Sequence, residues 1–241
     1  MLHTTQGIVL HNIRYADKKI ISKIYTKDFG LISANINVGS GPKAKIKSGV
    51  IQPLTQIEFV LSLKENKDIQ QISEIKCLFV YTDLQSNFGK LCIAQFLNEI
   101  LYKSIKEQIP NDDLFDLICH TYQWLDKADE AYIDTHIYFL FELTKHLGFY
   151  PINNRNNTLA YFDTLEGKFF STTKSFPLGF DYWQSELFAN LFSHSLSKQK
   201  KISRTERLAL LDCLLHYYKM QIPGFMELKS YPVLQEMAND L

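Results

Sequence analysis

The chain has 241 residues, of which 46% are hydrophobic and 13% aromatic, so it can bury the core of one large domain or two modest ones and is not composed like a disordered segment. No uncharged apolar run approaches the ~18 residues that a membrane span requires. Residues 1–7 lack the charged start and apolar stretch of a secretory signal. We therefore expect a cytoplasmic protein with reduced cysteines, because its four cysteines are widely spaced within apolar patterns.

The formal net charge of zero hides two halves of opposite sign. Residues 1–80 hold 11 Lys and Arg against 6 Asp and Glu, whereas residues 81–241 hold 15 against 20. The basic half has the pattern of β-strands and the acidic half mostly that of helices. A basic β-module is typical of proteins that bind a polyanion, and nucleic acid is the commonest large one.

Five strands are predicted in the first 80 residues. Alternating apolar and polar residues place them at 6–13, 20–26, 31–38, 55–63 and 69–81. Gly30 can adopt the positive φ of the turn between the second and third strands. Five short strands with little helix indicate a small closed barrel. The OB-fold is the five-stranded barrel that most often binds oligonucleotides, although an SH3-like barrel would give a similar pattern.

Helical periodicity begins near residue 86. The predicted helices cover residues 86–103, 112–125, 132–147, 183–195 and 203–220, with a last helical piece at the C-terminus. Ser203 and Glu206 match a capping box. Residues 159–170 have the pattern of a β-hairpin between helices. The sequence therefore predicts an α+β protein, with an OB-fold at 1–80 and a helical domain at 81–241 that carries a small hairpin.

The candidate binding residues are cations and an aromatic in the basic half. Asp17 and Asp28 are the only acidic residues between positions 11 and 49. On an OB barrel these side chains would lie on or near the loops that frame the groove of strands 2 and 3, where cations contact phosphates and aromatics stack on bases. A merely solvated, Lys-rich loop is the alternative. The candidates are Arg14, Tyr15, Lys18, Lys19, Lys27, Lys43, Lys45 and Lys47.

No catalytic or metal motif accompanies them. The sequence contains no Gly-rich phosphate loop, no HExxH, no GxSxG and no CxxC. We interpret Asp112, Asp113 and Asp116 as first-turn charges of a helix, and His136 and His146 as residues at the edge of the core. We expect no catalytic residue, no metal and no cofactor. A hydrolase that uses scattered Asp, Glu and His is a rival hypothesis, and it predicts a concave pocket with perturbed carboxylates.

Several short segments, in order along the chain, resemble the bacterial recombination mediator family RecO. In the basic half they are Gly7-Ile8-Val9-Leu10, Arg14-Tyr15, the segment from Tyr25 to Gly30, the loop at Gly39, and Leu54 preceded by Gln52-Pro53. In the helical half they are the segment from Leu147 to Pro151, Tyr161-Phe162-Asp163, the segment from Glu166 to Phe169, and Leu228-Lys229-Ser230.

The resemblance implies an OB-fold joined to a helical domain, without catalytic turnover. RecO-like proteins bind single- and double-stranded DNA, anneal complementary strands, and work with RecR to place RecA on DNA coated by single-strand binding protein (SSB). The family's affinity for the acidic, hydrophobic SSB tail implies a cationic, apolar groove in the helical half. The dense basic group there is Lys198, Lys200, Lys201, Arg204 and Arg207, for which a charged helix start is the alternative interpretation.

The chain departs from the family pattern at two places. Gly41 stands where many relatives carry an Arg, so Lys43, Lys45 or Lys47 would have to contact the phosphate there. Some relatives also hold zinc with four cysteines after the Leu147–Pro151 region, whereas this chain has no cysteine between 120 and 212. We expect the hairpin to be held instead by packed Tyr161, Phe162, Phe169 and Phe170. The remaining rival is an adaptor of the same fold that binds only proteins and has no affinity for DNA.

Overall fold

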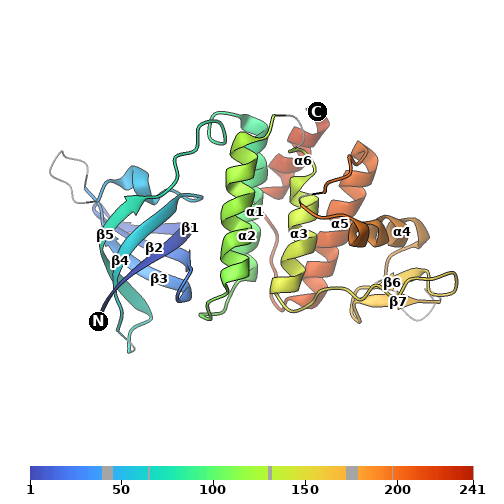
Figure 1. Ribbon diagram of the computed structural model, residues 1–241, viewed down its shortest axis with the longest axis horizontal. Coiled ribbons are helices and arrows are strands. Elements are labelled where there is room, and N and C mark those ends of the chain that lie inside the picture. The colour runs from blue at the N-terminus through green and yellow to red at the C-terminus, as the bar shows by residue number, and fades with distance from the viewer. Residues whose placement is uncertain (40–45, 65, 130–131, 172–178, 197, 241) are drawn as a thin grey trace. The chain divides into compact units, whose positions relative to one another are not determined.

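The computed structural model describes the chain except residues 40–45, 65, 130–131, 172–178, 197 and 241, and the side chains of 238–240 (Figure 1). The chain divides into two compact units, Met1–Lys127 and Ala128–Leu241. Among the described residues, the first unit contains five strands, two α-helices and a short 3-10 helix at Ser48–Ile51, and the second contains a short hairpin and the remaining helices.

The five strands of the first unit form a closed barrel. They are β1 (Leu2–Ala16), β2 (Lys19–Thr26), β3 (Gly30–Asn37), β4 (Gln56–Ser62) and β5 (Ile69–Cys77), in the order β1-β2-β3-β5-β4 with β4 paired back to β1 (Figure 1). The pairing of β3 with β5 is parallel and the other pairings are antiparallel. The predicted OB-fold is confirmed. Strand β1 is longer than expected because β4 pairs with its first half and β2 with its second.

Apolar side chains at every second position of the strands fill the interior of the barrel. On β3, Ile32, Ala34 and Ile36 are buried while the residues between them are partly exposed. They pack with other aliphatic residues and with Phe59 in a single core cluster. The interior is too tight for a side chain at Gly7, where a Cβ atom would lie 2.6 Å from Cγ2 of Ile24.

Helices α1 (Phe88–Ser104) and α2 (Asp112–Lys127) belong to the same compact unit as the barrel. The amide of Asn98 donates to the Leu10 carbonyl at 2.6 Å, and that of Gln56 donates to the Cys119 carbonyl at 3.3 Å. The Tyr25 hydroxyl donates to the carbonyl of Asn111 at 3.4 Å, and its side chain is buried. Such bonds satisfy polar groups that would otherwise be buried without partners. The helices therefore cover one part of the barrel surface.

The segment between β5 and α1 is anchored by Asp126. Its carboxylate accepts the backbone N–H groups of Thr82, Asp83 and Leu84 at 2.8 to 2.9 Å. Burial would raise the pKa of this carboxyl, but the N–H donors outweigh burial and its pKa lies below the ordinary value. The buried Lys90 adds an ion pair to Asp83 at 2.6 Å. The end of α2 thus fixes the chain just beyond the barrel.

The second unit has an aromatic core. It contains α3 (Thr135–His146), β6 (Tyr161–Asp163), β7 (Lys168–Phe170), α4 (Tyr182–Asn190), α5 (Arg204–Gln221) and α6 (Tyr231–Asp240). The ring of Phe162 lies 5.1 Å from Phe169 across the hairpin and 4.4 Å from Phe188 on α4. Phe162 and Phe169 are almost fully buried. The predicted hairpin is confirmed, and aromatic packing holds it.

Arg207 is a buried residue of this unit, which corrects its predicted place in a surface group. Its Nε donates to Oδ1 of Asp134 at 2.5 Å, and both side chains are 9% exposed. The other oxygen of Asp134 accepts the N–H of Ile202 at 3.0 Å. Removing one partner of such a pair leaves an uncompensated buried charge. Arg207 therefore holds α5 to the start of α3 and cannot serve a surface site.

The domain boundary predicted at residue 80 stays a prediction, and it can be tested with two fragments. We expect residues 1–81 to show the circular dichroism of a β-protein but to melt well below a fragment of residues 1–127, because only the longer fragment retains Asn98, Asn111 and Asp126. A small core alone is marginally stable. Thermal melts followed by circular dichroism measure the difference. Equal melting temperatures would show that α1 and α2 add nothing to the barrel.

A second prediction concerns His136, which lies in the buried cluster with Arg207. Burial, and next the charge of Arg207, lower the pKa of His136 to about 3. Below pH ~6.5 the unfolded chain binds a proton that the folded chain excludes, so the stability contribution is complete above that pH and is lost as the pH falls toward 3. Unfolding free energy should therefore drop by ~2 kcal/mol from this residue between pH 7 and pH 5, at ~1.4 kcal/mol per pH unit.

Urea unfolding at the two pH values measures this drop in the parent, in His136→Gln and in the control His120→Gln, which changes an exposed histidine. The His136 variant should lose less stability on acidification than the parent, and the His120 variant should lose as much. An unchanged pH dependence in His136→Gln would contradict the assignment.

Candidate nucleic-acid interface

One face of the barrel remains open, and strand register defines it. Residues directly opposite each other on paired strands project from the same side of a sheet. Ile13 of β1 pairs with Ile21, Ile21 with Asn35, and Asn35 with Gln71, which makes one row across β1, β2, β3 and β5. A second row runs from His11 through Lys23 and Ser33 to Ile69. We call the surface formed by these two rows the outer barrel face.

Helix α1 covers one end of the outer barrel face. The ring of His11 stacks on Tyr102 with centroids 4.5 Å apart. Beyond this contact the face is open, and Ile13 and Ile69 are 48% and 43% exposed. The open part therefore lies toward the turn that joins β1 to β2.

Four of the predicted residues lie in the β1–β2 turn or at the strand ends that flank it. Arg14, Tyr15, Lys18 and Lys19 are all exposed. The Tyr15 hydroxyl donates to Oδ1 of Asn35 at 2.9 Å, so its ring lies over the outer barrel face. Arg14 donates to the carbonyl of Asp17 at 3.5 Å, within the turn itself. Three cations and one aromatic thus surround the open end of the face.

Backbone bonds bring Lys47 to the same end of the barrel. The N–H of Val38 donates to the Lys18 carbonyl at 2.9 Å, and Gly39 forms a bridge with the exposed Lys47. Lys43 and Lys45 lie outside the described residues. Among the described candidates, the structure therefore groups Lys47 with the β1–β2 turn.

Lys27 lies at the other end of β2. The strand has eight residues, from Lys19 to Thr26, and a rise of ~3.3 Å per residue makes it roughly 25 Å long. The backbone N–H of Lys27 donates to the Gln6 carbonyl at 3.0 Å, at the start of β1. The structure therefore does not bring Lys27 together with the other candidates.

Sequence reasoning did not connect a second turn, which carries two lysines and two carboxylates, with the open face. Lys64 and Lys67 lie in the β4–β5 turn and line a groove of about 590 Å³. The side chain of Gln70 fixes this turn, because its oxygen accepts the Lys64 N–H at 2.8 Å and its nitrogen donates to the Lys64 carbonyl at 3.1 Å. The other lining residues are Asn35, Ser62, Asp68, Ile69 and Gln71. The sequence showed a polar turn but not the parallel β3–β5 pairing that places it beside Asn35.

The helical unit has a small basic and apolar cavity of about 40 Å³. Lys200 and Lys201 line it together with apolar side chains that include Leu187 and Leu191. The Tyr138 hydroxyl donates to the Lys200 carbonyl at 2.7 Å and accepts its N–H at 3.1 Å, which fixes the backbone that carries both cations. Lys198 and Arg204 are exposed nearby in the chain. Four of the five predicted basic residues are thus at the surface, and two line this cavity.

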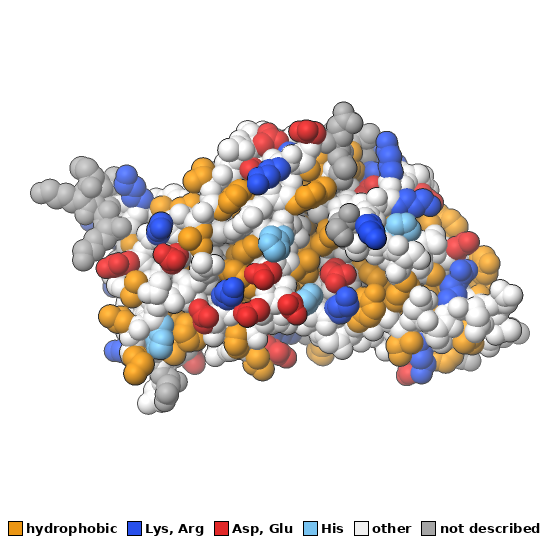
Figure 2. Space-filling model, in the orientation of Figure 1, with side chains coloured by type: hydrophobic (Ala, Val, Ile, Leu, Met, Phe, Trp, Pro, Cys, Tyr) orange, Lys and Arg blue, Asp and Glu red, His pale blue; other side chains and the backbone are white. Residues whose placement is uncertain are grey.

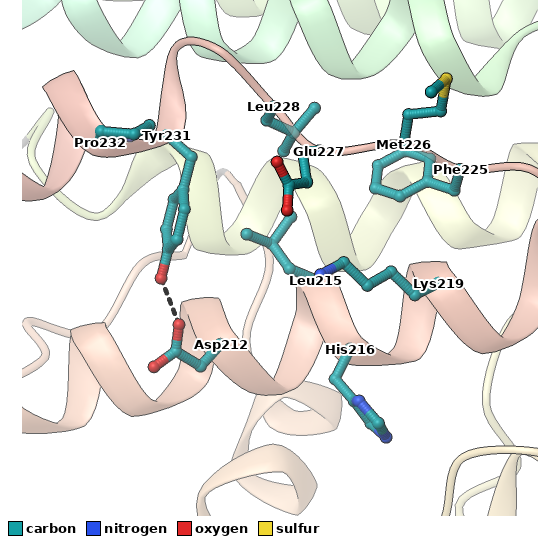
Figure 3. Close-up of a pocket in the computed structure, with 10 residues that line it drawn as sticks. All are labelled: Asp212, Leu215, His216, Lys219, Phe225, Met226, Glu227, Leu228, Tyr231 and Pro232. Atoms are coloured by element: carbon teal, nitrogen blue, oxygen red, sulfur yellow. Dashed lines mark hydrogen bonds between the residues drawn. The ribbon is translucent and has the colours of Figure 1, made fainter.

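A second cavity in this unit, of about 330 Å³, lies between α5 and the segment that leads into α6 (Figure 3). The Tyr231 hydroxyl donates to Asp212 at one end, while Lys219 and Glu227 extend toward the middle and His216 points away (Figure 3). Its charged residues are of both signs, so its charge favours neither an anion nor a cation.

Acidic side chains dominate part of the molecular surface. They gather around the middle of the view in Figure 2, with some cationic side chains among them, and over the barrel acidic, cationic and apolar side chains are interspersed. Helix α2 begins with Asp112 and Asp113, both exposed.

In the described part of the chain, no three His, Cys, Asp or Glu side chains are grouped as a metal site would need. No described helix combines the length and apolar character required to cross a membrane.

The barrel, its open face and the separate helical unit define a two-unit OB-fold protein. Two family models match the chain: Recombination protein O N terminal over residues 1–81, and Recombination protein O C terminal over residues 85–232. The proteins named DNA repair protein RecO from Bacteroides fragilis and Phocaeicola vulgatus are 34% and 31% identical to it, over 98% of this chain and 99% of theirs. The one from Flavobacterium psychrophilum is 31% identical over 97% of this chain and 98% of its own. This chain belongs to the RecO family.

Proposed function

We propose that this protein binds DNA through the open end of its barrel and acts in recombinational repair without catalytic turnover. The observation that carries the proposal is the grouping of Arg14, Lys18, Lys19 and Lys47 around an exposed aromatic, Tyr15, beside an uncovered OB-fold sheet. Lys and Arg bind the phosphate backbone and release its counterions, whatever the base sequence. The names of the relatives support the same role.

Annealing follows from the same electrostatics. Cations that neutralise the phosphates of two strands lower the repulsion between them. Contacts to phosphates and sugars carry no sequence information and leave base edges available for pairing. Binding to single- and double-stranded DNA and annealing of complementary strands therefore need no cofactor and no catalytic residue.

The first test of the proposed function reverses the charge of the two lysines at the β1–β2 turn. In Lys18→Glu/Lys19→Glu, affinity for a single-stranded oligonucleotide should fall. The slope of log affinity against log salt should flatten by up to about 1.4, at ~0.7 per phosphate contact. Annealing of complementary strands should slow, while the melting temperature should hardly change because exposed charges contribute little stability. Fluorescence anisotropy at several salt concentrations measures the affinity.

Lys127→Glu/Lys219→Glu is the matched control, since it makes the same charge change at two exposed helical residues. The control should keep the parental slope. A parent that binds no DNA at low salt would favour the rival in which the chain is an adaptor that binds only proteins. Equal losses of DNA affinity in Lys18→Glu/Lys19→Glu and in the control would show that only the net charge of the protein matters.

We propose further that the chain works with RecR to place RecA on SSB-coated DNA and that its small basic cavity receives the SSB tail. The tail is acidic and hydrophobic, and the cavity combines both complementary features in Lys200, Lys201 and buried or half-buried leucines. The two hydrogen bonds between the Tyr138 hydroxyl and the Lys200 backbone fix the segment that carries both lysines before binding, which lowers the ordering cost of that backbone.

A peptide with the sequence of the SSB tail tests this site. Lys200→Glu/Lys201→Glu should weaken its binding by roughly 5- to 30-fold, as expected for two ion pairs of ~0.5–1 kcal/mol each. Isothermal titration calorimetry measures the affinity, and Lys127→Glu/Lys219→Glu should bind like the parent. The opposite result would contradict this site. If Lys127→Glu/Lys219→Glu lost affinity for the peptide while Lys200→Glu/Lys201→Glu kept it, the peptide would bind at the second cavity, which Lys219 lines.

A further inference from the structure

Leu54, in the turn that precedes β4, has a backbone conformation that is rare for its residue type. Its φ is 76°, and no other non-glycine residue in the described part of the chain has a positive φ. The Thr55 N–H donates to the Gln52 carbonyl at 3.1 Å, and Pro53 stands second in the turn. This is the pattern of a type II turn, whose third position normally holds glycine. The turn therefore keeps a strained leucine where glycine would fit without strain.

Three contacts hold Leu54 in this conformation. Its side chain is only 4% exposed. Its N–H donates to the Val9 carbonyl at 2.9 Å, and its carbonyl accepts the Tyr81 hydroxyl at 3.1 Å. Tyr81 is itself fixed, because the N–H of the next residue, Thr82, donates to Asp126 at 2.9 Å. Burial and bonds to β1 and to the segment before α1 thus offset the strain.

The turn follows directly on the 3-10 helix Ser48–Ile51, which begins next to Lys47. The N–H of Val50 donates to the Lys47 carbonyl at 3.1 Å. The last residue of this helix is fully buried, and its carbonyl accepts the side-chain amide of Asn12 on β1. Residues 47–55 therefore form one bonded segment, with an exposed lysine at one end and the strained turn at the other.

We propose that Leu54 is a positioning residue for DNA binding, because its strained turn holds Lys47 beside the β1–β2 turn, where the lysine contacts a phosphate. The inference rests on the proposed function and adds a buried residue that acts on DNA only through Lys47. Strained backbone conformations persist where the surrounding structure over-determines them, and they gather at binding and active sites.

Glycine in place of Leu54 would relieve the strain but would also loosen the segment. Glycine adopts either sign of φ readily, and it has no side chain to bury, so the segment that carries Lys47 would sample more conformations. Binding would then have to order this segment, which lowers affinity. The strained leucine thus places the cost of ordering Lys47 in folding instead of in binding.

A double-mutant cycle on the full-length protein tests whether Leu54 acts through Lys47. Fluorescence anisotropy measures the affinity of the parent, Lys47→Ala, Leu54→Gly and the double variant for a labelled single strand at several salt concentrations. Each single variant should bind roughly 2- to 5-fold more weakly, as for one exposed ion pair. Each should flatten the slope of log affinity against log salt by up to ~0.7, as for one phosphate contact. The double variant should lose no more than Lys47→Ala alone, since residues that act as one unit are not additive.

Two further variants serve as controls. Added to Lys18→Glu/Lys19→Glu, Leu54→Gly should cause its full loss of affinity, because those lysines lie at a different turn. Tyr81→Phe removes the hydroxyl that holds the Leu54 carbonyl, and it should weaken DNA binding in the parent but not in Lys47→Ala. Tyr81→Phe also keeps the test decisive if Leu54→Gly does not fold.

The strain itself has a separate readout in urea unfolding. Leu54→Ala keeps a Cβ atom at the positive φ, whereas Leu54→Gly has none. Leu54→Ala should therefore unfold at a lower urea concentration than Leu54→Gly, although it retains more of the side chain. The reverse order would show that the turn is not strained and would overturn the inference.

The binding outcomes separate this inference from the proposed function. If the parent binds no DNA, the proposed function fails, and the inference fails with it. If the parent binds DNA but Leu54→Gly and Tyr81→Phe bind like the parent, the inference is overturned while DNA binding stands. Fully additive losses in the cycle would also overturn it, because Leu54 would then act by another route. So would a Lys47→Ala variant with parental affinity, since Leu54 would have no contact to position.

Discussion

The closure of the barrel depends on β1, because this one strand pairs with both β2 and β4. At Gly7 the two pairings overlap: the residue lies opposite Thr26 on one side and Ile57 on the other. The strands approach so closely there that a Cβ atom would contact both Ile24 and Phe59 at less than 3.0 Å. Two register shifts follow, between Val9 and His11 and between Arg14 and Ala16. Such bulges bend a strand and re-aim its side chains.

The bulges and the helices together decide which part of the sheet is open. After the first bulge, Ile13 faces outward, opposite Ile21, and the second bulge frees Tyr15 to reach over β3. Helices α1 and α2 then cover the other part, where burial, and next the charge of Asp112, raise the pKa of Tyr25 to about 12. An OB-fold with both parts covered would have no room for a ligand on its sheet. The uncovered part is the one that carries exposed apolar and amide side chains.

Local sequence patterns were sufficient to predict the strands and helices but not the contacts between residues that are distant in the sequence. Period-two alternation located all five strands, and the Ser203 and Glu206 capping box is present at the start of α5. Arg207 was misplaced because its partner, Asp134, lies 73 residues away. Helical spacing could have corrected this, since Arg207 shares a face with Leu210, Leu211 and Leu214, all of them buried. Asp126 gave no such signal, because its bonds run to backbone N–H groups more than 40 residues away.

The same limit applies to the candidate interface. Sequence proximity grouped Lys27 with Lys18 and Lys19, but a strand of eight residues carries its two ends to opposite sides of the barrel. Conversely, Lys64 is distant in sequence from Tyr15, and only the parallel pairing of β3 with β5 brings its turn beside Asn35. Contacts between distant segments arise from topology, which alternation of residue types does not encode.

Opposite charges are therefore separated between the two ends of β2, as well as between the two halves of the sequence. At its first end, Lys19 lies with Arg14 and Lys18, and Asp17 is the acidic residue of that turn. At its other end, the charge of Asp112 raises the pKa of Tyr25, so the acidic start of α2 lies close to the residues that precede Lys27. A polyanion is attracted at one end of the strand and opposed at the other, and both effects weaken with salt. For the proposed binding of DNA, this polarity favours the open end of the barrel, where Tyr15 lies.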